Sequence, residues 1–330
     1  MANKHGDGLL PIDWEVLLPA GPALANHAGC IVGNTFYVHG GVTRHRGIVP
    51  SNKLYDLHLD TLIWNEVRVE GSPHLSHHAC VAIDDRYMVL IGGWDGQSRL
   101  SSVHVFDTKG RVWCNPVDIG FPEEAGLSSH AALLLDTGNI LVVGREGCKR
   151  TVEKHGNAYL LRPDFEKMVF EYTKISADSI SRSGHTLNTL DNIAFILGGR
   201  ADDFIEFHKG FNSKEPLGAL NSNFIDILRK NVLLPLTSHP NGRKHHISIV
   251  GKDCIIMHGG EVFKGKSRTP VSDMLLMIAK PEPSFYKIGN SAVARAAHVC
   301  VNIGDRVIFH GGVGWNNVIY GDCYELKLRI

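Results

Sequence analysis

The chain has 330 residues, and its 34 lysines and arginines balance 34 aspartates and glutamates, so the formal net charge is zero. A balanced charge removes the bulk attraction that draws basic proteins to nucleic acid or anionic membranes, so neither is expected as a partner. With 43% hydrophobic and 21% charged residues, the composition is that of a globular protein and excludes extensive disorder.

The sequence contains no apolar run of the roughly 18 residues that a membrane helix needs, and its start lacks the apolar core of a signal peptide. The cysteines contain no CxxC pair, which argues against a disulfide framework and a structural zinc module. We therefore expect a reducing, intracellular location in the cytoplasm, with the cilium or axoneme and the nucleus left open. The seven cysteines are Cys30, Cys80, Cys114, Cys148, Cys254, Cys300 and Cys323.

The first predicted element is a short strand at residues 12–18, Ile-Asp-Trp-Glu-Val-Leu-Leu. Beyond it, an apolar run that ends in glycine recurs at steps of 52, 51, 55, 61 and 52 residues. A period of this length is typical of repeat folds. The marker glycines are Gly41, Gly93, Gly144, Gly199, Gly260 and Gly312.

Other features keep step with the marker glycines. A histidine precedes each marker by 14 residues, or by 15 in the second repeat. After each glycine the pattern predicts a turn, an alternating strand such as residues 52–58, and a strand that opens on an aromatic residue such as Trp64 or Trp113. Each unit therefore predicts four strands. The phased histidines are His27, His78, His130, His185, His246 and His298.

Four antiparallel strands in about 50 residues make one blade of a β-propeller. The sequence therefore predicts an all-β fold in which residues 1–330 form a single six-bladed β-propeller. The last unit lacks its outer strand, so residues 12–18 are expected to supply it, with Trp14, and to close the ring.

The double glycines are assigned to the architecture, because a residue without Cβ permits positive φ and close backbone approach where inner strands crowd. The same structural role is assigned to Trp14, Trp64 and Trp113. The paired glycines are Gly40 and Gly41, Gly92 and Gly93, Gly198 and Gly199, Gly259 and Gly260, and Gly311 and Gly312.

The fourth unit is too long by about ten residues, and we assign residues 200–243 to an insertion. Apolar residues recur with helical spacing over 217–234, between Pro216 and Pro235, which predicts a helix in blade four. Its apolar face would either dock on the propeller or bind a partner.

Six copies of an apolar run that ends in glycine, doubled in five of them, with a Tyr-x-Asp strand and a Trp after it, resemble the kelch repeat family over nearly the whole chain. Runs such as Ser76-His-His and Gly92-Gly-Trp-Asp-Gly resemble one member of that family. The resemblance implies a kelch-type propeller whose loops bind a protein or peptide. Because many functions share this fold, the implied function rests on analogy.

The sequence offers no catalytic constellation. GxSxG, GxxxxGK[ST] and HExxH are absent, and the nearest match to the iron-binding pattern of plant kelch enzymes has Glu70 where aspartate is expected. The phased histidines are expected to bond within blades rather than to bind metal. We expect no enzyme activity, no metal and no cofactor.

Candidate partner-binding residues lie near the blade ends. Arginine forks match carboxylates, and loop aromatics anchor partners. Alternatively, the arginines pair within their own blades and the tryptophans cover an adjacent blade. The candidates are Trp94, Asp95, Arg145, Arg182, Arg200, Arg243, Arg295 and Trp315.

These observations predict a non-enzymatic interaction module or scaffold, monomeric within a complex, whose rigid loops bind a protein or peptide. One alternative is a structural subunit of a large assembly such as the ciliary axoneme. A second is a substrate receptor of a cullin-type ubiquitin ligase, and a metal-dependent kelch enzyme comes last.

Overall fold

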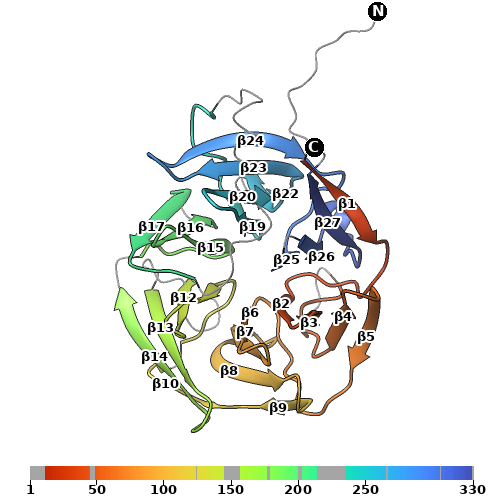
Figure 1. Cartoon of the computed structure of the whole chain (residues 1–330), viewed down its shortest axis with the longest axis vertical. Coiled ribbons are helices and arrows are strands. Elements are labelled where there is room, and N and C mark those ends of the chain that lie inside the picture. Colours follow the sequence, from red (N-terminus) through yellow and green to blue (C-terminus); the bar gives the residue numbers. More distant parts are fainter. Residues whose placement is uncertain are drawn as a thin grey trace, which may run out of the picture.

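The computed structural model describes residues 12–44, 49–123, 125–144, 157–176, 179–199, 203–213, 235–264, 267–304 and 306–328. Antiparallel sheets dominate these residues and lie around a common axis (Figure 1), so the all-β prediction is confirmed. We call the segments around the six marker glycines repeats one to six. The one helical element in the described part of the chain is a 3₁₀ turn, η1 (Trp315–Asn317).

Repeats one and two each form a four-stranded sheet in which consecutive strands are neighbours. Repeat one contains β2 (Ala28–Val32), β3 (Thr35–His39), β4 (Leu54–His58) and β5 (Ile63–Val67). Repeat two contains β6 (Ala79–Ile83), β7 (Tyr87–Trp94), β8 (Arg99–Asp107) and β9 (Val112–Cys114).

Repeats three and four depart from this pattern. Repeat three has a fifth strand, β10 (Val117–Ile119), which pairs in parallel with the outer strand β14 and was not predicted. Its other strands are β11 (Ala131–Leu134), β12 (Ile140–Gly144), β13 (Asn157–Asp164) and β14 (Val169–Ser176). In repeat four the described strands are β15 (His185–Leu190), β16 (Ile193–Gly198) and β17 (Ile205–Lys209).

The predicted insertion over 200–243 is partly corrected, because β17 lies inside it and pairs with β16 as part of the repeat-four sheet. Arg243 also lies in a strand, β18 (Arg243–Lys244). The helix predicted over 217–234 lies outside the described residues.

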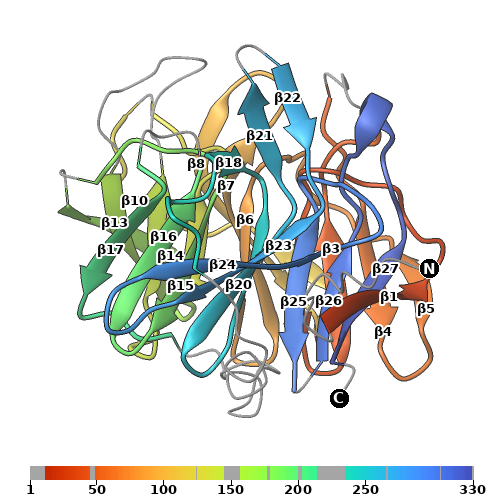
Figure 2. The same ribbon diagram turned by 90° about the horizontal axis from the view of Figure 1, so that it is seen from above.

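Repeat five carries a second, smaller sheet. Its main strands are β19 (Ile247–Val250), β20 (Cys254–His258), β23 (Asp273–Ile278) and β24 (Ser284–Asn290). A hairpin of β21 (Glu261–Lys264) and β22 (Ser267–Pro270) follows the double glycine, pairs with β18 and projects from one end of the molecule (Figure 2).

The first strand of the chain completes the sheet of the last repeat. That sheet has the order β1 (Ile12–Leu18), β27 (Cys323–Leu328), β26 (Arg306–His310) and β25 (Val299–Ile303). Trp14 lies opposite Leu326 in the antiparallel β1–β27 pair. Residues 12–18 thus occupy the outer position expected for them, and the two ends of the described chain meet in one sheet.

Apolar side chains fill the space between neighbouring sheets. One buried cluster joins repeats one and two, with Leu54 and Met88 among its members, and another joins repeats six and one through Ile308 and Phe36. Four further clusters join the remaining neighbours in turn. Because each sheet buries both faces against its neighbours, stability depends on an unbroken sequence of contacts around the axis.

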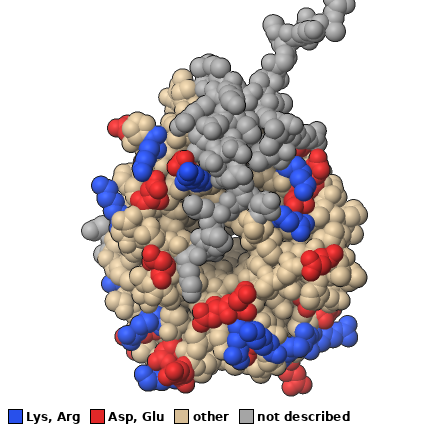
Figure 3. Space-filling view, in the orientation of Figure 1, with Lys and Arg blue, Asp and Glu red and all other residues tan. Residues whose placement is uncertain are grey.

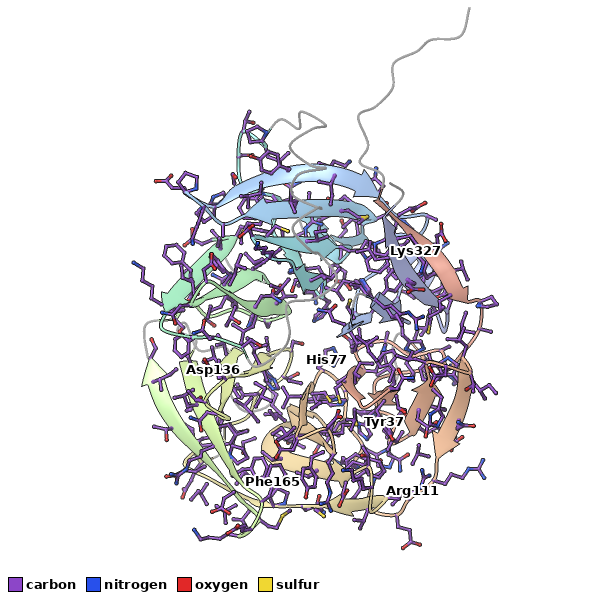
Figure 4. The ribbon with its side chains drawn as sticks, viewed as in Figure 1. Tyr37, His77, Arg111, Asp136, Phe165 and Lys327 are labelled. Atoms are coloured by element: carbon purple, nitrogen blue, oxygen red, sulfur yellow. The ribbon has the colours of Figure 1, made fainter. Side chains whose placement is uncertain are left out.

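A closed ring of backbone hydrogen bonds surrounds the axis. The residue before each phased histidine donates its N–H to the carbonyl of the same residue in the preceding repeat, at N···O distances of 2.7–3.0 Å. All six have positive φ, and the five that are not glycine hold a strained conformation that the ring stabilises. The six residues are Asn26, His77, Ser129, Gly184, His245 and Ala297. His77 is labelled beside the axis in Figure 4, with Arg111, Phe165 and Lys327 near the periphery.

The phased histidines explain the paired glycines. A Cβ added to Gly40 would lie 2.9 Å from the His78 ring of the next repeat, and one added to Gly41 would lie 2.7 Å from the Cβ of His27 in its own repeat. The first glycine therefore admits the neighbouring imidazole and the second admits its own. In repeat two, the extra residue between histidine and glycine lies in the three-residue turn between β6 and β7.

We expect Gly40→Ala to lower the free energy of unfolding by about 3 kcal/mol, because a Cβ there would overlap the Leu75 carbonyl oxygen of repeat two and φ is positive. Gly33→Ala is the matched control, since φ is also positive at Gly33 but nothing lies within 4 Å of its Cβ position. Strain alone should cost about 1 kcal/mol there. Equal losses in urea denaturation would show that the close approach between repeats contributes nothing.

Candidate protein-interaction surface

Three of the predicted partner-binding arginines are buried. Arg182 and Arg295 are 0% exposed and Arg243 is 3% exposed. Each donates to the carbonyl oxygen of the first glycine of its own repeat. The pairs are Arg182 with Gly198 at 2.8 Å, Arg243 with Gly259 at 3.2 Å and Arg295 with Gly311 at 2.9 Å.

Each of these arginines also binds a carboxylate of its own repeat. Arg295 Nη1 lies 2.7 Å from Asp322 Oδ1, and Arg243 donates to both oxygens of Asp273 at 2.8 and 2.9 Å. Arg182 Nη2 lies 3.2 Å from Glu206 Oε2. The placement of these three arginines at a partner-binding surface is therefore corrected, because they are buried and their Nη groups are committed to bonds within the repeat.

Repeats one to three hold leucine where repeats four to six hold these arginines. Leu24, Leu75 and Leu127 lie three residues before their phased histidines and are buried. The carbonyls of Leu24 and Arg295 play the same part, since they accept the N–H of Gly312 and of Gly260 from the preceding repeat. The position is thus a core position that admits either a leucine or an arginine with its carboxylate.

We expect Arg295→Ala to destabilise the protein by about 3–5 kcal/mol, because it leaves Asp322 and the Gly311 carbonyl largely buried without their partner. The double variant Arg295→Leu with Asp322→Asn copies the leucine of repeats one to three and should recover most of that loss. Urea denaturation of the three proteins measures both effects. A double variant no more stable than the single one would contradict the role assigned to the ion pair.

Buried histidines join three of the boundaries between repeats. His39 Nδ1 lies 3.2 Å from His78 Nε2, His258 Nδ1 lies 3.1 Å from His298 Nε2, and a third pair joins repeats six and one at 3.1 Å. Burial lowers the pKa of His39 and of His258 to about 3, so both rings are neutral and one nitrogen of each pair donates to the other. The third pair is His310 and His27.

The predicted structural tryptophans pack on these histidines. Trp113 of repeat two lies against His39 of repeat one, with ring centroids 5.3 Å apart. Trp64 lies 4.9 Å from His310, and Trp14 lies 5.3 Å from His258. Each of these three outer strands thus contributes an aromatic ring to the boundary with the preceding repeat.

The aromatic candidates differ in exposure. Trp94 is half-buried at the end of β7, where its backbone exchanges hydrogen bonds with Ser76. Asp95 Oδ1 accepts the N–H groups of Gln97 and Ser98, both at 2.7 Å, so this carboxylate shapes its own turn. Trp315, by contrast, is 57% exposed and lies at the tip of the β26–β27 loop.

Two candidates, Arg145 and Arg200, lie outside the described residues.

A turn of the chain holds Trp315 in place: Gly314 N–H donates to the Val318 carbonyl at 2.9 Å, and Val318 N–H donates to the Trp315 carbonyl at 3.2 Å. Of the predicted candidates that the structure describes, Trp315 is therefore the one that exposes a large apolar side chain to solvent.

Sequence reasoning did not find a cavity on the axis. It has a volume of about 860 Å³ and lies along the axis among the inner strands, at the end opposite the double glycines. Asp84, Asp85 and Asp191 line its mouth together with Lys252. Figure 3 shows this end, where acidic side chains lie beside the axial hollow. Aspartates in the first turn of several repeats were the available sequence signal.

The cavity wall also carries thiols. Cys30, Cys80 and Cys300 line it from the inner strands of three neighbouring repeats. Burial raises the pKa of the Cys80 and Cys300 thiols far above the usual range, so these two remain protonated and are poor nucleophiles. The wall therefore offers polar and apolar surface rather than a reactive group.

Within the described ranges, no three histidine, cysteine or acidic side chains gather closely enough to hold a metal ion. A search of the same residues found no helix of the length and apolar character needed to cross a membrane.

The repeated sheets, the paired glycines and the phased histidines define a kelch-repeat β-propeller. The model of the KLHDC2/KLHL20/DRC7 Kelch-repeats domain matches residues 13–199, more than half of the chain, and the chain belongs to the kelch-repeat family. The family resemblance expected from the sequence is confirmed.

Comparison with individual proteins agrees with this assignment. The chain is 28% identical to Kelch domain-containing protein 9 of Mus musculus, over 92% of this chain and 90% of that protein. A segment covering 34% of this chain is 30% identical to 3% of the dynein alpha chain of the flagellar outer arm of Chlamydomonas reinhardtii. The solved structure of YjhT covers 93% of this chain and 95% of its own, with a TM-score of 0.67 and 16% identity, which shows a shared fold.

Proposed function

We propose that the chain is a single six-bladed propeller that serves as a non-enzymatic protein-interaction module or scaffold. The closed ring of six axial hydrogen bonds and the six clusters between neighbouring repeats support a rigid single domain. A rigid ring loses little conformational entropy when its loops bind a partner.

The observation that carries this proposal is Trp315, a large aromatic side chain 57% exposed on a hydrogen-bonded turn. Tryptophans that a rigid turn holds in solvent are typical anchors of protein interfaces. The buried charges favour the same function, because Arg182 and Arg295 are bonded to backbone carbonyls and carboxylates of their own repeats.

A structural subunit of a large assembly, such as the ciliary axoneme, is the second candidate. The similarity of a third of this chain to the flagellar dynein alpha chain favours it. A substrate receptor of a cullin-type ligase is the third, and a metal-dependent enzyme the last. We propose an intracellular, cytoplasmic location, with the cilium or nucleus as alternatives.

Affinity purification of the intact chain from its native cells, with mass spectrometry and a metal assay on the same sample, tests the proposal. A stoichiometric protein partner is expected. Elongin and cullin subunits would indicate the ligase receptor, and axonemal proteins the structural subunit. A stoichiometric metal without a protein partner would overturn the proposal.

A further inference from the structure

We propose that the double-glycine end of repeats five, six and one forms one docking surface for an acidic segment of a partner protein that also carries an apolar side chain. The inference rests on the proposed interaction function and names its face and its chemistry. We call this surface the basic aromatic surface; its members are Arg44, Val49, Phe263, Arg268, Trp315 and Val318.

The three loops are neighbours at one end of the ring. Each follows the double glycine of its repeat, and in an antiparallel sheet these turns all lie at the same end. Backbone bonds join the repeats in this order, since Gly260 N–H donates to the Arg295 carbonyl and Gly312 N–H donates to the Leu24 carbonyl. Figure 2 shows the β21–β22 hairpin projecting at this end.

Apolar side chains are exposed on all three loops. Val49 of repeat one is 68% exposed, Phe263 of repeat five is 36% exposed, and Trp315 and Val318 of repeat six are 57% and 49% exposed. These side chains are much more exposed than those of the core. Exposed apolar groups that gather on consecutive repeats are typical of an interaction site.

The loops carry positive charge without matching negative charge. Arg44 and Arg268 are exposed and have no ion-pair partner among the described residues. The acidic groups of the same loops are already paired: Glu261 lies 3.7 Å from Lys244, while Asp273 and Asp322 bind the buried arginines. The surface therefore attracts carboxylates, which arginine binds through two parallel hydrogen bonds.

The hairpin combines both features in one pair of residues. Phe263 and Arg268 lie directly opposite each other in the β21–β22 ladder, so the ring and the guanidinium lie on the same face of the hairpin. Strand β22, which carries Arg268, lies in the same small sheet as β18, and β18 ends directly before the axial residue His245. A bound segment would reach from the hairpin towards Trp315.

Trp315 is presented by strained backbone. Asn316 and Asn317 are consecutive non-glycine residues with φ of 55° and 60°. Such residues cost about 1–3 kcal/mol each and persist where the surrounding structure holds them, commonly at binding sites. Tyr320 N–H donates to the Gly312 carbonyl at 2.9 Å and closes the base of the loop, so the tryptophan is held in place before a partner binds.

The test uses a random twelve-residue peptide library displayed on phage and selected on the immobilised full-length chain. We expect enrichment of peptides that combine aspartate or glutamate with at least one large apolar residue. The strongest peptide is then synthesised and its affinity measured by fluorescence anisotropy. Trp315→Ala and Arg268→Glu should each weaken it at least tenfold, and raising the salt concentration should weaken it further.

Matched controls change equally exposed groups elsewhere. Ile63→Ala removes an exposed apolar side chain from β5, and Lys252→Glu reverses a charge at the opposite end of the axis. Both should leave the affinity unchanged, and melting temperatures check that all variants fold. Three results would overturn the docking surface: no enrichment, enrichment of neutral or basic peptides, or an affinity of Trp315→Ala and Arg268→Glu equal to that of the unaltered chain.

The affinity purification separates this inference from the proposed function. A partner retained by the Trp315→Ala, Arg268→Glu double variant would support an interaction module and overturn this surface. Failure of the unaltered chain to retain any stoichiometric partner would overturn the proposed function itself.

Discussion

Acidification is expected to unfold the protein between about pH 6 and pH 5, above the range in which most carboxylates protonate. The cause is the number of buried neutral histidines. Burial lowers the pKa of twelve histidines below the usual value, to about 3 or 4 at seven of them. They are His27, His39, His77, His78, His104, His130, His185, His245, His246, His258, His298 and His310.

The sign follows from which state binds protons. Below the unfolded pKa of about 6.5, the unfolded chain protonates its histidines while the folded chain does not. The free energy of unfolding therefore has its full value above about pH 6.5 and decreases as the pH falls towards the lowered pKa of the histidines in the folded state. Each such histidine removes about 1.4 kcal/mol per pH unit, so twelve of them exceed a typical total stability of about 5–15 kcal/mol within roughly one unit.

Far-ultraviolet circular dichroism from pH 8 to pH 4 measures the midpoint, and urea denaturation at several pH values measures the number of protons taken up. We expect an uptake of about ten protons near pH 5.5. The double variant His77→Asn, His245→Asn is a matched control, because Asn26 already holds the same axial position with positive φ in repeat one. It should reduce the uptake by about two protons. Unfolding only below pH 4.5 would contradict the explanation.

The same histidines show why much of the fold was predictable from the sequence. The His78 ring of repeat two packs on Gly40 of repeat one, and His298 packs on Gly259 in the same way. Five of the six boundaries place the histidine against the first glycine of a pair, and at the sixth His185 lies against the Val143 carbonyl, so the sequence must keep the spacing, and the spacing appears as a period. The Trp14 strand was predictable for a related reason, since the last repeat lacked the outer strand that Trp64 begins in repeat one.

The role of the arginines was not predictable from spacing. Arg182, Arg243 and Arg295 bind carboxylates that lie 24, 30 and 27 residues further along the chain, so no fixed offset marks the pairs. Buried leucines at the same position in repeats one to three were the signal that this position faces the core. A buried arginine at this position of the repeat needs a buried partner for its charge.

Features that occur once were missed altogether. Strand β10 joins the sheet of repeat three in parallel, and among the described residues a separate hairpin such as β21–β22 occurs in repeat five alone. Neither feature produces a pattern that recurs along the sequence. The axial cavity depends on inner strands from the whole ring, so no local pattern describes it.

Trp14→Ala is expected to lower the free energy of unfolding by about 3–5 kcal/mol, because it opens a cavity where the two ends of the chain meet. Trp14 is buried among residues of repeats five and six, with its ring 4.6 Å from that of Phe309. It is also the residue through which β1 contributes to the boundary between these repeats, beside His258. The loss therefore weakens both the β1–β27 pair and that boundary.

Val16→Ala is the matched control, since Val16 lies two residues away in the same strand and is exposed. It should change stability by no more than about 0.5 kcal/mol. A chain that starts at residue 21 loses β1 entirely, and β27 then presents an open edge. We expect this chain to be strongly destabilised and to regain stability when a peptide of residues 9–20 is added, because the peptide can pair with β27 as β1 does. Equal effects of Trp14→Ala and Val16→Ala, or no response to the peptide, would show that β1 does not hold the ring closed.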